Sequence, residues 1–230
     1  MSAQEKLFNL PLAIGIVALA VAGLFTFTKS FPASSDRSEN LPDQVILPIP
    51  FSPQAPNDNW SRNEDCEETS ITMANAFLSG NTSNTLESSE AQKSIDNLKI
   101  WEDANLGFNV DTGADATTRM AEGAFSLKVT QIAGFTEQDL KRELASGYPI
   151  LLPINAKLIK GQQYRNEGPT YHMVVIRGYR NGKFIINDPG TERGNGNEFT
   201  FQDLHNAAAD WDNHAQEMKP DRKIVLVLSK

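Results

Sequence analysis

The sequence contains a single cysteine, Cys66, among 230 residues, and only three histidines. One cysteine cannot form an internal disulfide, and no Cys/His cluster has the spacing of a structural zinc site. The sequence therefore predicts neither a disulfide scaffold nor a metal centre, and we expect no cofactor. Stability must come from an apolar core.

Basic clusters are also missing. The chain has 21 Lys and Arg against 29 Asp and Glu, a formal net charge of −8, and no run of basic residues longer than two. Recognition of phosphate needs a concentrated basic face, so the sequence excludes a typical nucleic-acid-binding protein. Apolar residues make up 40% of the chain, which excludes disorder throughout and is typical of a globular protein of one domain, at most two.

Charge is absent from the segment between Leu7 and Thr28, which is apolar on every side of a helix in its middle. About 20 residues at a rise of ~1.5 Å cover a hydrocarbon core of ~30 Å, so this run can span a bilayer. We interpret residues 1–29 as an N-terminal signal anchor with one transmembrane helix. Cleavage of a signal peptide is the alternative, because residues 18–20 and 20–22 both read Ala-x-Ala.

The segment that follows, residues 30–45, is polar and rich in Pro and Ser, so we expect a flexible tether. Residues 46–230 then form the folded domain. Because the N-terminus is short and the C-terminal part is long, we expect a single-pass membrane protein with an extracytoplasmic domain. If the signal is cleaved, the domain would instead be secreted.

Within the domain, helical patterns come first and strand patterns later, which predicts an α+β fold with an antiparallel sheet. The helical segments are 67–79, 86–98, and 136–144 with Thr136 as its N-cap. The strand-like runs are Ile150–Ile154, Met173–Ile176, Phe184–Ile186 and Ile224–Leu228. Asn181-Gly182 lies between the second and third runs and predicts a two-residue hairpin turn.

Three residues could carry chemistry in this arrangement. Cys66 opens the first helix, where unpaired N–H groups and the helix dipole favour the nucleophilic thiolate. His172 begins one strand and Asp188 follows its hairpin partner, so the two should lie side by side. Taken separately, a lone cysteine is more often buried packing and an Asp-Pro pair is often a turn. Together they indicate a nucleophile, a base and the acid that orients the base.

The ordered set of motifs resembles the papain-like cysteine peptidases related to the bacteriocin-processing, or double-glycine leader, peptidases. The resemblance covers about residues 46–230 and rests on Cys66 at its helix, the segment Thr136–Ile150, the run His172–Tyr179 and Phe184–Pro189. It implies a papain-like fold with Cys66 as nucleophile, His172 as general base and Asp188 as its orienting acid. It also implies that Gln54 donates from its side chain to the oxyanion hole.

The sequence departs from that family beside the cysteine, where Glu67 and Glu68 replace small residues. With Glu64 and Asp65, they should raise the pKa of the thiol, and we expect them to crowd the approach of a substrate. Two functions follow. The first is a membrane-anchored cysteine peptidase with peptide or protein substrates. The second is a catalytically inactive papain-like domain that binds peptide or protein partners at the cell surface.

Overall fold

The computed structural model describes residues 40–60, 64–161, 164 and 168–230. The signal anchor predicted for residues 1–29 lies outside these residues, as does the tether up to residue 39. Among the helices in the described part of the chain, none combines the length and the apolar character that crossing a bilayer requires. Residues Asn40 to Lys230 belong to one structural unit.

Helices and strands follow in the order that the sequence predicts, with helices concentrated in the first half. The helices are α1 Cys66–Leu78, α2 Ser88–Asn105, α3 Ala114–Phe125, α4 Glu137–Ala145, the 3₁₀ turn η1 Ala156–Leu158 and α5 Phe201–Ala207. The strands are β1 Val45–Ile46, β2 Lys128–Ala133, β3 Ile150–Ile154, β4 His172–Arg180, β5 Lys183–Asn187, β6 Asn195–Phe199, β7 Asp210–Asp212, β8 Glu217–Lys219 and β9 Ile224–Ser229. The predicted α+β class is confirmed.

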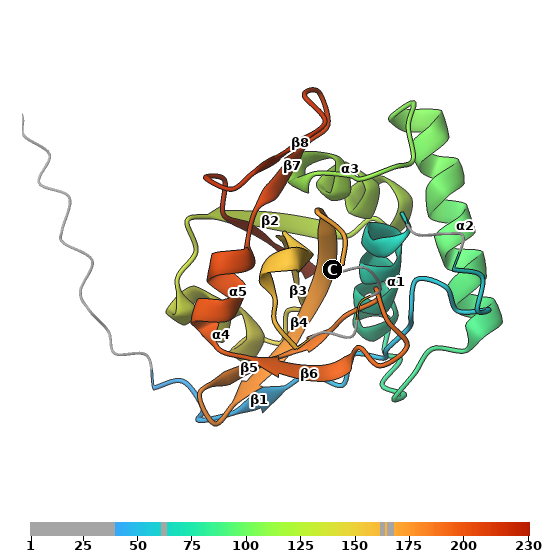
Figure 1. Cartoon of the computed structure of the whole chain (residues 1–230). Coiled ribbons are helices and arrows are strands. Elements are labelled where there is room, and N and C mark those ends of the chain that lie inside the picture. Colours follow the sequence, from blue (N-terminus) through green and yellow to red (C-terminus); the bar gives the residue numbers. More distant parts are fainter. Residues whose placement is uncertain (1–39, 61–63, 162–163, 165–167) are drawn as a thin grey trace, which may run out of the picture. The chain divides into compact units, whose positions relative to one another are not determined.

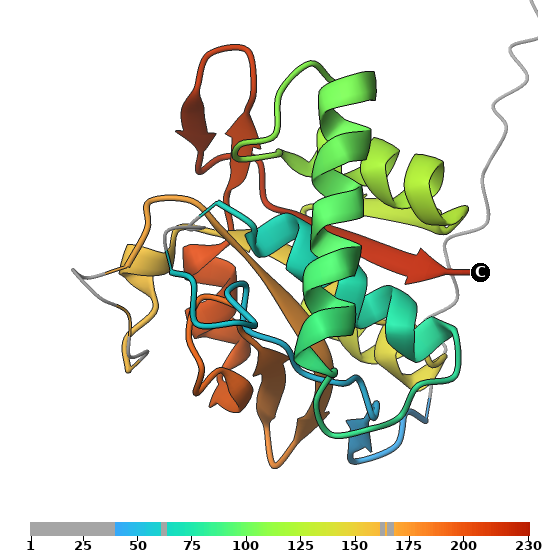
Figure 2. The same ribbon diagram turned by 90° about the vertical axis from the view of Figure 1, so that its right-hand side faces the viewer.

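The core of the domain is a seven-stranded antiparallel sheet in the order β2-β9-β3-β4-β5-β6, with β1 paired to the far end of β4. In Figure 1, α1 and α2 lie on one side of this sheet, and α4 and α5 lie on the other. Strands covered on both faces should read as continuous apolar runs, and all five residues of β3 are indeed buried. Figure 2 shows α2 in front of α1, which packs against the sheet.

The hairpin between β4 and β5 turns at Asn181 and Gly182, as predicted. Both residues have positive φ, at 50° and 73°, which matches the two-residue turn that fits the twist of antiparallel strands. Pairing runs from Arg180 opposite Lys183 back to Val175 opposite Asn187. The open end of this hairpin therefore carries His172 on one strand and Asp188 just beyond the other.

The three predicted helices are present. The ends of α1 and α4 lie within one residue of the prediction, whereas α2 continues to Asn105, seven residues beyond its predicted end. α4 begins with the expected cap, a capping box in which the Thr136 hydroxyl accepts from the backbone N–H of Asp139, while the Asp139 carboxylate accepts from that of Thr136. Helix α3 and strands β1, β2, β6, β7 and β8 were not predicted. Helix α3 is rich in Ala and Thr, and Met120 is the one large side chain among its buried residues, so it shows no clear apolar stripe in the sequence. Strand β2 has only Val129 and Ile132 as large apolar residues.

Candidate active site

Cys66 is the first residue of α1, which packs against β4. Asp65 precedes it at the N-cap but makes no side-chain bond to the helix. Instead, the buried Asp65 carboxylate pairs with Lys99 of α2 at 2.5 Å. The start of α1, and with it the predicted nucleophile, is thereby tied to a second helix.

The thiol of Cys66 lies against the carboxylate of its neighbour Glu67. The sulfur donates to Glu67 Oε2 at 2.9 Å, and Glu67 Oε1 accepts from the backbone N–H of Thr112 at 2.5 Å. Burial raises the pKa of the Cys66 thiol well above its ordinary value, and the charges of Glu67 and Glu68 raise it further. In this arrangement the sulfur is a protonated donor.

Two further carboxyl groups, those of Glu68 and Glu102, are buried beside Glu67. Burial raises the pKa of Glu68 to about 7. Burial and the neighbouring Glu68 raise the pKa of Glu102 to about 10. The expectation that Glu67 and Glu68 crowd the approach of a substrate is wrong, because both are only 1% exposed and neither lines the cleft described below. They lie behind the thiol.

His172 and Asp188 meet at the open end of the β4–β5 hairpin, as the sequence predicts. The imidazole Nε2 lies 2.7 Å from Asp188 Oδ1, and both side chains are buried. A carboxylate at Nε2 favours the tautomer that carries its proton there. The other ring nitrogen, Nδ1, is then the one that can accept a proton.

A cleft of about 910 Å³ brings the predicted residues together. Three of the four line it, namely Cys66, His172 and Gln54, while Asp188 lies behind the imidazole. Gln54 is buried, and its backbone N–H donates to the carbonyl of Pro189 at 2.8 Å. The other residues that line the cleft include Trp60, Glu64, Asp111, Tyr164, Tyr171, Glu192, Arg193 and Trp211.

Sequence reasoning missed two polar residues of this cleft, Asp111 and Tyr164. Burial raises the pKa of Asp111 to about 6, an effect strengthened by Glu64 and opposed by His172. Tyr164 donates its hydroxyl proton to Asp188 Oδ2 at 2.5 Å. Neither residue belongs to a periodic segment, so no pattern in the sequence could have indicated them.

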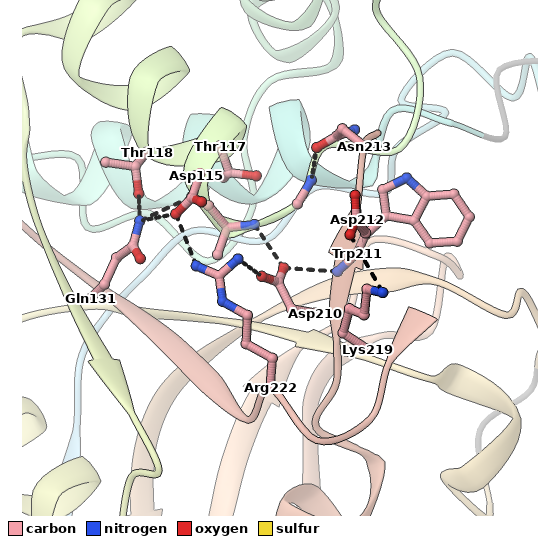
Figure 3. A network of polar contacts seen from close by, with 12 residues as sticks. Asp115, Thr117, Thr118, Gln131, Asp210, Trp211, Asp212, Asn213, Lys219 and Arg222 are labelled. Carbon is pink, nitrogen blue, oxygen red and sulfur yellow. Dashed lines mark hydrogen bonds and ion pairs between the residues drawn. The ribbon is translucent and has the colours of Figure 1, made fainter. Parts of the chain in front are cut away.

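The cleft wall formed by Trp211 is held by a polar network that joins the β7–β8 ribbon to the start of α3. Asp210 Oδ1 accepts from the backbone N–H groups of Ala114 and Trp211, both at 2.8 Å, and Arg222 bonds both Asp210 and Asp115 (Figure 3). A carboxylate at the N-terminus of a helix is stabilised there by its unpaired N–H groups.

The loop that precedes α3 connects this network to the residues around the nucleophile. Asn213 accepts from the N–H of Gly113 at 2.9 Å and donates to the carbonyl of Asp111, and between them Thr112 N–H holds Glu67. A Cβ atom at Gly113 would lie 2.0 Å from the Trp211 carbonyl oxygen, so this close approach requires glycine. The position of Glu67 against the thiol thus depends on a loop whose own contacts, from Asp111 and Gly113 to Asn213, join residues about 100 positions apart in the sequence.

The model of a known protein family matches residues 46–218, three quarters of the chain. The chain belongs to the Peptidase_C39 like family. This confirms the predicted kinship with the papain-like cysteine peptidases related to bacteriocin-processing enzymes. No curated protein sequence matches the chain.

A solved structure similar to this member of the Peptidase_C39 like family is described as a C39-like peptidase from Bacillus anthracis. The two share 18% sequence identity over 82% of this chain and 98% of the other, with a TM-score of 0.54. At that identity the match supports the fold alone. For this Peptidase_C39 like chain, membership of the family indicates a cysteine peptidase.

Proposed function

We propose that this domain hydrolyses peptide bonds with Cys66 as nucleophile, His172 as general base and Asp188 as the orienting acid. The observation that carries the proposal is the bond of 2.7 Å between His172 Nε2 and Asp188, in the cleft that Cys66 also lines. A thiol and an oriented imidazole facing one cleft are the parts that acyl transfer needs.

In the first step, His172 Nδ1 takes the thiol proton and the Cys66 sulfur attacks the substrate carbonyl carbon. The imidazolium then gives its proton to the leaving amine, the C–N bond breaks, and a thioester remains on Cys66. Water attacks the thioester with His172 again as base, which releases the carboxylic acid and restores the thiol. Asp188 stabilises the imidazolium in both halves of the reaction.

The oxygen of the attacked carbonyl becomes negative in each half and needs donors aimed at it. We assign this role to the side-chain amide of Gln54 and to the backbone N–H of Cys66. Gln54 lines the same cleft as Cys66, and its backbone N–H donates to the carbonyl of Pro189, the residue that directly follows Asp188. Its position is thus linked to that of the orienting acid.

We also propose that residues 1–29 anchor the protein in a membrane, with the domain extracytoplasmic. The uncharged segment Leu7–Thr28 supports this proposal. The full chain should stay in the membrane fraction at high salt and leave it only with detergent. A mature N-terminus near Gly23 would contradict the anchor and indicate a secreted enzyme.

Hydrolysis of a peptide library by the full chain, measured against Cys66→Ser, tests the peptidase. We expect fragments from the wild type alone, together with labelling of its single cysteine by an activity-based thiol probe. Because Cys66 is the only cysteine, the label reports on this site alone.

One observation favours a second function. The thiol is bonded to Glu67, and its pKa is raised rather than lowered. If Cys66 titrates like an ordinary buried thiol and no peptide is cleaved, the domain is an inactive member that binds peptide or protein partners in its cleft. In that case, Cys66→Ser should leave the binding of such partners unchanged.

A further inference from the structure

The Asp188 carboxylate has a partner on each of its two oxygens. Oδ1 accepts from His172 Nε2 at 2.7 Å and from the backbone N–H of Gly190 at 2.9 Å. Oδ2 accepts from the hydroxyl of Tyr164 at 2.5 Å. A buried carboxylate that accepts several hydrogen bonds is fixed in rotation, because turning it would break all of them.

Tyr164 also contacts the imidazole itself. Its ring meets that of His172 edge to face, with centroids 5.7 Å apart and an angle of 82° between the planes. This is a favoured geometry for two aromatic rings. One side chain therefore contacts both members of the His172–Asp188 pair, with its hydroxyl on the acid and its ring on the base.

The surrounding backbone leaves room for this contact. A Cβ atom at Gly190 would lie 2.9 Å from two atoms of the imidazole and 3.1 Å from the Tyr164 ring. At Gly168, where φ is +84°, a Cβ atom would lie 2.7 Å from the Tyr164 ring. The absence of side chains at both positions lets the tyrosine ring lie close to His172.

We propose that Tyr164 is a positioning residue that holds the Asp188 carboxylate in the orientation which keeps the His172 proton on Nε2. The effect of Tyr164 on kcat rests on the function proposed above, whereas its effect on the tautomer of His172 does not. With the proton held on Nε2, Nδ1 stays available to accept the thiol proton.

The tyrosine can act only as a donor here. Burial and the neighbouring Asp188 raise its pKa far above the ordinary value, so the hydroxyl keeps its proton over the whole range in which an enzyme works. The donor in this contact therefore does not change with pH in that range.

The test compares Tyr164→Phe with the matched control Tyr179→Phe in the full chain. Tyr179 lies on β4, the same strand as His172, and its hydroxyl donates to the carbonyl of Pro42 at 2.8 Å. Both variants lose one tyrosine hydroxyl and one hydrogen bond, but only the first touches Asp188. With three histidines in the chain, ¹⁵N labelling resolves each imidazole, and the His172 signal is assigned by its loss in His172→Gln.

We expect the neutral His172 to be the Nε2–H tautomer in the wild type and in Tyr179→Phe. In Tyr164→Phe we expect a mixture of both tautomers and a fall in kcat of roughly tenfold with KM unchanged, because geometry is lost in the chemical step and not in binding. Wild-type ¹⁵N shifts of His172 in Tyr164→Phe would overturn the proposal, whatever happens to kcat.

The tautomer measurement needs no turnover. If Cys66→Ser proved as active as the wild type, the peptidase proposal would fail, yet the ¹⁵N shifts would still decide the role of Tyr164.

Discussion

The two sides of the cleft hold their charges in opposite ways. On the histidine side, formed by His172, Asp188, Tyr164 and Gly190, the Asp188 carboxylate accepts hydrogen bonds from the other three residues. On the cysteine side, Cys66 lines the cleft, and behind it the carboxyl groups of Glu67, Glu68 and Glu102 are buried against one another and against the thiol. The first side stabilises a charge, whereas the second opposes one.

Under the proposed mechanism, His172 is therefore prepared to act as a base, whereas Cys66 is restrained as a nucleophile. Burial alone would raise the pKa of both the thiol and the carboxyl groups beside it, and their mutual repulsion adds to the effect. Under that mechanism, turnover requires the thiol to exchange Glu67 for His172 as the acceptor of its proton.

Removing the base should have the largest effect. His172→Ala should abolish turnover, a loss on the order of 10⁶-fold, whereas Asp188→Ala should cost less, on the order of 10⁴-fold, because Asp188 takes no part in bond making. Rates of peptide hydrolysis measure both. The exposed His214 offers the matched control His214→Ala, which should keep the wild-type rate. Equal losses of the hydrolysis rate in His172→Ala and His214→Ala would show that the histidine side has no specific part in the reaction.

A substitution at Gln54 tests its proposed role as the side-chain donor to the oxyanion. Gln54→Ala should lower kcat roughly 10²–10³-fold through the loss of one donor to the oxyanion. Alkylation of Cys66 by iodoacetamide should proceed at the wild-type rate, since that reaction forms no oxyanion. A parallel fall in both rates would mean that Gln54 supports the fold of the cleft instead.

On the cysteine side, Glu67→Gln tests whether the carboxylate next to Cys66 restrains the thiol. It removes the nearest negative charge from the thiol, so the Cys66 pKa should fall and alkylation at neutral pH should speed up about tenfold. Glu68→Gln should act in the same direction and more weakly, because Glu68 makes no bond to the sulfur. The exposed Glu90 gives the control Glu90→Gln, for which no change is expected. Unchanged alkylation in Glu67→Gln would show that burial alone restrains the thiol.

The smallest expected effect is on how the free energy of unfolding depends on pH. The folded-state pKa values of Glu68 and Glu102, about 7 and about 10, lie above the ordinary value of 4.5, so the folded domain keeps protons that the unfolded chain loses. Their contribution to stability is complete below about pH 4.5 and is lost as the pH rises toward 7 for Glu68 and toward 10 for Glu102.

The free energy of unfolding should therefore fall by at most about 1.4 kcal/mol per pH unit for each group in its window. Urea unfolding at a series of pH values measures this slope. In Glu102→Gln the slope between pH 7 and 10 should become flatter. An identical slope in the variant would show that Glu102 ionises as readily in the folded domain as in the unfolded chain.

The same division explains what could be predicted from the sequence. The histidine side depends on a local hairpin, and the turn at Asn181-Gly182 with its flanking strands was enough to bring His172 beside Asp188. The cysteine side depends on distant contacts. The bond between Thr112 and Glu67 exists only because Asn213 and the β7–β8 ribbon hold the loop before α3, and no local pattern encodes that pairing.

Strand β9, residues Ile224–Ser229, lies between β2 and β3 although it is the last strand of the domain along the chain. During synthesis, β2 and β3 emerge early but cannot be joined until residues 224–229 have left the ribosome. The ribbon that holds the loop behind the thiol also comes late, at residues 210–219. A growing chain thus cannot complete its cleft until translation has passed the whole domain.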